Sequence, residues 1–162
     1  MKIFIIVLIV FVTFEAMAVC QATRDSVLSV NYKKNVVYGT FGLYPGATYN
    51  LNYERQIIHL VKCSVSSINI RLGYGVYGDL AGSEKLFLLS SNFIFGQGSS
   101  HFETDLGAAY LFDIVRMNSE NENGVIPVIN AGYRFQKKNG HFVFRTGIGW
   151  PDCIYMSLGF AM

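Results

Sequence analysis

The segment GHFVFRTGIGWPDCIYMSLGFAM, from Gly140 to Met162, decides the fold because two alternating runs flank its Pro151-Asp152 pair. Apolar residues occupy every second position of the later run: Ile154, Met156, Leu158, Phe160 and Met162. The positions between them hold Tyr155, Ser157, Gly159 and Ala161. An alternation of period two predicts a β-strand. Most side chains on this second face are small, and few are polar. A strand in a soluble sheet, in contrast, normally presents a clearly polar face to water.

The same two-residue period recurs along most of the chain and predicts eight strands. The other seven predicted strands cover residues 35–44, 47–58, 66–77, 85–96, 101–113, 125–136 and 141–150. Short turn segments separate them, and the Asn-Gly pair of the KKNG turn is a strong hairpin signal. After the N-terminus no helical period extends over a useful length. Eight hairpin-linked strands form an antiparallel meander that must close or cover its edges.

The composition places this sheet in an apolar environment. Hydrophobic residues make up 51% of the chain and charged residues 15%, against about 25% in a typical soluble domain. One face of most strands is bulky and apolar, and the other is glycine-rich with a few charges of mixed sign. Bulky residues suit hydrocarbon, and small residues with paired charges suit a narrow lumen. We therefore predict an all-β fold, an eight-stranded antiparallel up-and-down transmembrane β-barrel. Candidates for its interfacial aromatic girdles are Tyr44, Tyr77, Tyr133 and Trp150.

Six charged residues fall on the predicted inner face, three of each sign: Glu54, Glu103, Asp105, Arg71, Arg134 and Arg145. Charges in a low-dielectric interior are unfavourable unless they are paired. We expect these side chains to form one network that plugs the lumen and fixes the register of the barrel. The alternative is a path for protons or ions through the same groups. An eight-stranded barrel is narrow enough for side chains to fill, which favours the plug.

The N-terminal residues have the pattern of a targeting segment. MKIFIIVLIVFVTF has one Lys followed by an apolar core, and small residues follow in EAMAVCQA. This pattern is typical of a secretory signal peptide, which we assign to residues 1–22. Cleavage after Ala22 or after Ala18 fits the small residues. A retained signal anchor and a lipoprotein modified at Cys20 are the other interpretations.

After the signal peptide, the predicted chain consists of an N-terminal segment, residues 23–34, and the barrel, residues 35–162. Two cysteines, Cys63 and Cys153, then remain. An exported chain with two cysteines could form one disulfide. The predicted layout puts them at opposite ends of the barrel, so we expect two free, mostly buried thiols.

Two stretches, GVIPVINAGYRFQKKNGHFVFRTGIGWPDCIYMSLGFAM and TYNLNYERQI, carry a family resemblance. They resemble small outer-membrane β-barrel proteins of Gram-negative bacteria, of the eight-stranded OmpA/OmpX type, over about residues 36–162. The resemblance implies a location in the cell outer membrane, with both termini in the periplasm and residues 118–124 outside the cell. It also implies a monomer in contact with outer-membrane lipid, with the barrel-assembly machinery as its partner during insertion.

Members of this family often end in an aromatic residue, and the insertion machinery reads the alternating apolar residues before it. The resemblance therefore implies an insertion signal made of Ile154, Met156, Leu158, Phe160 and Met162. The last of these departs from the aromatic pattern, which bears on the efficiency of insertion and not on the fold.

Other functions fit the residues less well. A soluble lipocalin-like barrel that binds an apolar ligand would have to expose its aromatic face or turn its charged face outward. A lipid-modifying enzyme would need a Ser, a His and an acid near the outer rim, but His59, His101 and His141 all fall near the predicted periplasmic rim. Their spacing matches no metal motif, so we expect solvated side chains there, no metal and no cofactor. The net charge of +2 is too small for a nucleic-acid surface. We expect a structural or surface-interaction role without catalysis.

Overall fold

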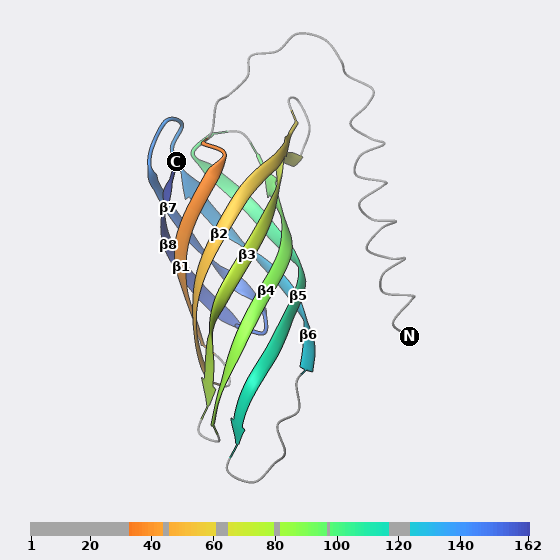
Figure 1. Ribbon diagram of the computed structural model, residues 1–162. Helices are drawn as coiled ribbons and strands as arrows, with labels where there is room; N and C mark the ends of the chain where they lie inside the picture. The colour runs from red at the N-terminus through yellow and green to blue at the C-terminus, as the bar shows by residue number, and fades with distance from the viewer. Residues whose placement is uncertain (1–32, 44–45, 61–64, 80–81, 97, 117–123) are drawn as a thin grey trace.

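The computed structural model describes residues 33–43, 46–60, 65–79, 82–96, 98–116 and 124–162. These residues form eight strands: β1 (Asn35–Leu43), β2 (Ala47–His59), β3 (Val65–Asp79), β4 (Gly82–Phe95), β5 (Ser100–Arg116), β6 (Gly124–Gln136), β7 (Phe142–Trp150) and β8 (Ile154–Ala161). Each strand pairs with its neighbours in the chain, and β8 pairs with β1, so the sheet closes into a barrel (Figure 1). The predicted eight-stranded antiparallel barrel is confirmed. The predicted signal peptide lies outside the described residues, and no described segment forms a helix suited to cross a membrane.

The seam between β1 and β8 closes the sheet. It is antiparallel, and its register runs from Val36 opposite Ala161 to Gly42 opposite Tyr155. Backbone hydrogen bonds extend the seam by one more residue, since Met162 N–H donates to the carbonyl of Asn35 at 2.8 Å. A closed sheet has no free edge strand, so every strand of the barrel has a hydrogen-bonded neighbour on both sides.

The KKNG turn between β6 and β7 has the geometry that its Asn-Gly pair predicts. Asn139 has a φ angle of 58°, and the N–H of Gly140 donates to the carbonyl of Lys137 at 2.9 Å. Asparagine tolerates this left-handed conformation better than other residues that carry a Cβ. The turn is therefore tight, and it holds β6 and β7 in register.

The outer surface of the barrel is apolar and its interior is charged, the reverse of a soluble protein. On the outside, Ile148 is 64% exposed and Phe160 is 52% exposed. In the lumen, Arg71 is 2% exposed and Arg145 is completely buried. Because side chains alternate along a strand, each strand presents one of these surfaces on each side. The predicted direction of the two faces is confirmed.

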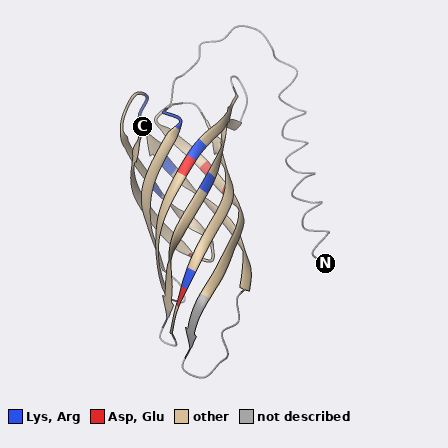
Figure 2. Ribbon diagram, viewed as in Figure 1, with Lys and Arg blue, Asp and Glu red and all other residues tan. Residues whose placement is uncertain are grey.

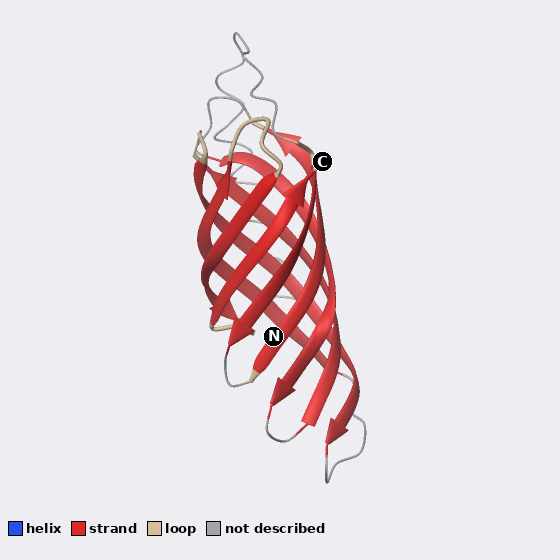
Figure 3. Cartoon of the chain, turned by 90° about the vertical axis from the view of Figure 1, so that its left-hand side faces the viewer, coloured by secondary structure: helices blue, strands red, loops and turns tan. Residues whose placement is uncertain are grey.

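The barrel has two distinct ends. We call the end that carries the start of β1 and the end of β8 the terminal rim; it lies at the top of Figure 1. The ends of β2, β4 and β6 also lie at the terminal rim, and the ends of β1, β3, β5 and β7 lie at the opposite rim. The strands are tilted and unequal in length, with 17 residues in β5 and 8 in β8. One side of the barrel therefore extends further at the opposite rim (Figure 3).

Several sequence-based details differ from the structure. The strands continue into the predicted turn GDLAGSE, because β3 ends at Asp79 and β4 begins at Gly82, and β5 continues to Arg116. Tyr77 is not part of an aromatic girdle. Its side chain is on the same inward face of β3 as that of Arg71, and it packs against buried lumen residues such as Leu86. Of the other girdle candidates, Tyr133 and Trp150 are exposed on the outside, and Tyr44 lies outside the described residues.

Candidate functional site

Alternation along five strands turns six charged side chains into the lumen, where they meet. They come from β2 (Glu54), β3 (Arg71), β5 (Glu103, Asp105), β6 (Arg134) and β7 (Arg145), and none is more than 2% exposed. These are the six predicted residues, and the structure brings all of them together. Figure 2 shows charged positions on several strands in the upper part of the barrel, toward the terminal rim. We call this group the lumen network.

Arg145 is the centre of one half of the lumen network. Its Nε atom lies 2.6 Å from Oε1 of Glu103, and its Nη2 atom lies 3.0 Å from Oδ2 of Asp105. The same Asp105 oxygen lies 2.9 Å from Nη1 of Arg71. Asp105 therefore joins two arginines, and removal of any one partner would leave a buried charge without full compensation.

Arg134 holds the other half of the lumen network. Its Nη1 atom lies 2.6 Å from Oε1 of Glu54, and its Nε and Nη2 atoms donate to the side-chain oxygen of Gln136 at 3.1 and 2.8 Å. Longer contacts of 3.7 Å join Arg134 to Glu103 and Arg145 to Glu54. The two halves are therefore linked, and the three positive charges balance the three negative ones.

Tyr38 connects both halves, and it was not among the residues predicted from the sequence. Arg145 Nη1 donates to the hydroxyl of Tyr38, which in turn donates to Oε2 of Glu54 at 3.2 Å. The guanidinium carbons of Arg145 and Arg71 lie 4.6 and 5.6 Å from the centroid of its ring. Arginine over an aromatic face is a favourable cation–π arrangement. Tyr38 therefore contributes hydrogen bonds and cation–π contacts to the lumen network.

Asparagines complete the lumen network and were also missed as members. Asn52 accepts a hydrogen bond from Arg71 Nε at 3.0 Å, and Asn92 donates to Asp105 at 2.7 Å. Both asparagines are fully buried or nearly so. Hydrogen bonds to charged groups contribute more than those between neutral groups, roughly 1.5–3 kcal/mol each. The sequence could have indicated this inward position, because Asn52 is two residues from Glu54 on the same strand and therefore on the same face.

A glycine makes room for one of these asparagines. Gly73 lies directly opposite Asn52 in the register of β2 and β3. A Cβ at position 73 would collide with the side-chain oxygen of Asn52, and that oxygen is the one that accepts from Arg71. Glycine is therefore needed at position 73 so that Asn52 can bind Arg71 in a narrow lumen.

An apolar cluster fills the lumen on the side of the opposite rim. Leu86, Leu88, Ala109 and Val128 are each at most 2% exposed, and they lie on β4, β5 and β6. Tyr77 packs against them. Since the lumen network occupies the adjoining part of the lumen, buried side chains fill the barrel over both of these stretches.

A smaller polar contact lies near the opposite rim. The hydroxyl of Thr48 donates to the carboxylate of Asp152, which lies between β7 and β8 and is 3% exposed. Burial raises the pKa of the Asp152 carboxyl above its usual value, and the Thr48 hydrogen bond opposes this shift. Next to it, Cys153 is a free thiol, as predicted, but it is partly exposed and not mostly buried. Cys63 lies outside the described residues.

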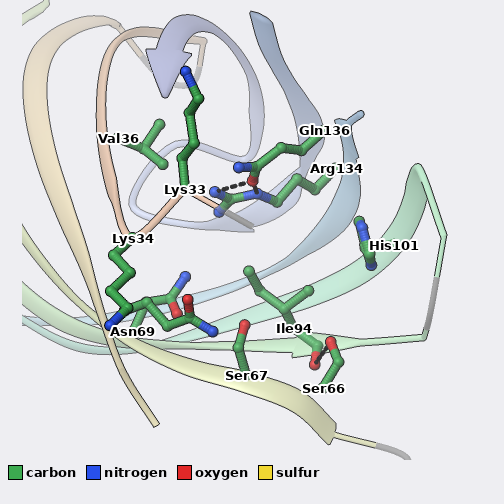
Figure 4. Close-up of a pocket in the computed structure, with 11 residues that line it drawn as sticks. Lys33, Lys34, Val36, Ser66, Ser67, Asn69, Ile94, His101, Arg134 and Gln136 are labelled. Carbon is green, nitrogen blue, oxygen red and sulfur yellow. Dashed lines mark hydrogen bonds between the residues drawn. The ribbon is translucent and has the colours of Figure 1, made fainter. Parts of the chain in front are cut away.

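A polar pocket opens at the terminal rim (Figure 4). Its volume is about 20 Å³, which is room for a water molecule or a small ion. In Figure 4, the hydrogen-bonded pair of Arg134 and Gln136 lies across the pocket from Asn69 and Ser67. The pocket therefore includes Arg134 of the lumen network in its lining, and most of its other lining side chains are polar.

The three histidines lie toward the terminal rim, but they are not equivalent. His59 and His141 are exposed, whereas His101 is only 5% exposed, so the prediction that all three are solvated is wrong for His101. His101 is buried because it lies two residues from Glu103 on β5, so both side chains point into the lumen. Among the described residues, no three His, Cys, Asp or Glu side chains are arranged to hold a metal ion.

Solved structures of other proteins are similar to this chain, and two of them are named below. No protein-family model matches the chain, and no curated protein sequence matches it significantly. The N-terminal β-barrel domain of OprF from Pseudomonas aeruginosa is 17% identical, with a TM-score of 0.49, over 80% of this chain and 96% of that one. The outer membrane enzyme PagL is 17% identical, with a TM-score of 0.48, over 77% of this chain and 95% of that one.

Proposed function

We propose that this protein is an integral outer-membrane β-barrel with a structural or surface-interaction role, without catalytic activity. The observation that carries the proposal is the reversed polarity of the barrel. Large apolar side chains cover its outside, among them Leu51, Ile129 and Ile154, each more than half exposed. Lipid accepts such a surface, and it also requires a closed sheet because it offers no hydrogen-bond partners to a free edge. In this proposal the barrel is monomeric, contacts outer-membrane lipid and is inserted by the barrel-assembly machinery.

The lumen network is proposed to act as a plug that also fixes the register of the strands. Its six charges come from β2, β3, β5, β6 and β7 and are linked to one another by ion pairs. An ion that crossed the lumen would have to separate these pairs and pass the apolar cluster at Leu86 and Leu88. The alternative, a proton or ion path, requires that the network open.

The lipocalin-like alternative has less support. An apolar ligand inside the barrel would have to displace the buried charges at Arg145 and Glu54, which would then lose their partners. It would also leave the exposed aromatic surface in water, where contiguous apolar patches of this kind are uncommon. Fractionation tests this alternative, because a soluble protein leaves the membrane pellet.

Gel mobility tests the membrane-barrel proposal directly. The protein is refolded in detergent and run in SDS with and without boiling. We expect the unboiled protein to migrate differently from the boiled one, because a closed barrel resists SDS at room temperature. Identical mobility, together with release from the membrane pellet, would contradict the proposal.

Planar-bilayer recording tests the plug, and an activity screen tests the absence of catalysis. We expect no steady open channel from the purified barrel in a bilayer where a wide porin conducts. Steady open channels would refute the plug while leaving the barrel itself intact. A reproducible change in lipopolysaccharide or phospholipid, lost on denaturation, would favour the lipid-modifying alternative.

A further inference from the structure

Arg55, on β2 near the terminal rim, points away from the lumen. Among the strand residues whose side chains the structure describes, Arg55 and Lys85 are the charged ones on the outer surface. Lys85 lies toward the opposite rim, and Arg55 lies toward the terminal rim between two exposed apolar residues, Tyr53 and Ile57. An arginine on the lipid-facing surface is tolerated near the interface, where it can reach polar groups.

Arg55 has a polar neighbour in the adjoining strand. Asn35 lies directly opposite Arg55 in the register of β1 and β2, so both share the outer face. The hydroxyl of Tyr53 donates to the side-chain oxygen of Asn35 at 2.8 Å. This bond orients the Asn35 amide and leaves its nitrogen as a donor on the same outer face as Arg55. Together they present several N–H donors on the outer surface.

No described residue forms an ion pair with Arg55. The other exposed charged side chains described at the terminal rim are also positive: Lys34, Lys137 and Lys138. The described side-chain carboxylates of this half of the barrel, those of Glu54, Glu103 and Asp105, are buried in the lumen network. The described charged side chains on the outer side of this rim are therefore all positive, an arrangement that favours an anion there.

We propose that Arg55 and Asn35 bind the phosphate of an anionic phospholipid in the membrane leaflet at the terminal rim. A guanidinium matches the geometry of a phosphate and binds it through two parallel hydrogen bonds. A phospholipid fits better than a free anion because Tyr53 and Ile57 flank the donors and would contact its glycerol and acyl region. The inference rests on the proposed function, since it requires that the outer surface face lipid.

Native mass spectrometry of the detergent-folded barrel tests this inference. Phosphatidylglycerol and phosphatidylcholine are added separately, and the lipid adducts on the intact protein are counted. We expect preferential retention of phosphatidylglycerol, and about a tenfold weaker apparent affinity for it in Arg55→Gln, the loss of one charge-assisted contact. Arg55→Lys is expected to weaken binding less, because an ammonium keeps the charge but lacks the fork of donors.

Lys138→Gln is the matched control, since it removes one exposed positive charge at the same rim. It is expected to leave the phosphatidylglycerol adducts almost unchanged. Equal adducts in Arg55→Gln and the wild type, or equal losses in Arg55→Gln and Lys138→Gln, would overturn the site. Displacement of the lipid by inorganic phosphate would show a free-anion site instead. If the wild type lacks a heat-dependent gel shift, the membrane-barrel proposal itself fails; a normal shift without lipid preference overturns only this inference.

Discussion

Arg145 and Glu103 lie side by side in the lumen, with 2.6 Å between Nε and Oε1 and with each side chain only 1% exposed. Breaking a buried ion pair by removing one partner leaves the other charge uncompensated, and this typically destabilises a protein by about 3–5 kcal/mol. We therefore expect Arg145→Met to lower the free energy of unfolding by an amount in that range. Urea titration of the detergent-folded barrel measures it, with the unboiled gel band as the readout of folded protein.

Two further variants separate the buried pair from a general loss of charge. Lys138→Met removes an exposed cation and should change the free energy of unfolding by no more than about 0.5 kcal/mol. Adding Glu103→Gln to Arg145→Met should recover part of the lost stability, because it removes one of the uncompensated carboxylates. If Arg145→Met is as mild as the Lys138 variant, the lumen network does not stabilise the barrel.

Gly73 and Asn52 provide a test of packing inside the lumen. Gly73→Ala places a methyl group against the side-chain oxygen of Asn52, and the nearest other atom is the Cβ of Leu88 at 3.3 Å. Overpacking of a tight interior costs about 1–3 kcal/mol, and we expect a loss of stability in that range. Because the collision is with a side chain, the same substitution should cost less in an Asn52→Ala background. Strictly additive losses in the double variant would contradict this account.

The fold and the six charged members of the lumen network could be predicted because both depend on alternation within single strands. Glu103 and Asp105 are two residues apart on one strand, so they must share a face whatever their neighbours are. A charged residue inside a transmembrane strand also favours the lumen face, because a charge in contact with lipid is unfavourable. Local sequence was therefore sufficient to predict that these side chains point into the lumen.

The pairing within the lumen network depends on distant strands and could not be predicted. Arg134 and Arg145 lie directly opposite each other in the register of β6 and β7, a like-charge pair that sequence reasoning would avoid. It is tolerated because Glu54 from β2 lies 2.6 Å from Arg134. Tyr38 was missed because a tyrosine suits either face of a strand, and its role is set by contacts across the barrel.

Asp152 should give the barrel a defined dependence on pH. Burial raises the pKa of its carboxyl above the ordinary value, and the Thr48 hydroxyl opposes the shift. The folded state therefore favours the protonated form, and this stabilisation is fully present below the ordinary pKa of about 3.9 and is lost as pH rises through the folded value. We expect Asp152→Asn to be more stable than the wild type at pH 7 and similar to it at pH 3, measured by urea midpoints. A less stable Asn variant at pH 7 would show that the ionised carboxylate is preferred.

The alternating apolar residues of β8 remain a predicted insertion signal, and the structure offers a matched pair with which to test it. Phe160 on β8 lies directly opposite Phe142 on β7, and the two rings are 52% and 54% exposed on the outer surface. Phe160→Ser and Phe142→Ser therefore remove similar rings at the same height of the barrel. If the assembly machinery reads β8, only Phe160→Ser should slow insertion severalfold into vesicles that contain the machinery, and Met162→Phe should speed it. Insertion is followed by the appearance of the unboiled gel band with time. Equal slowing by the two serine variants would mean that lost contact with lipid, and not a signal in β8, limits insertion.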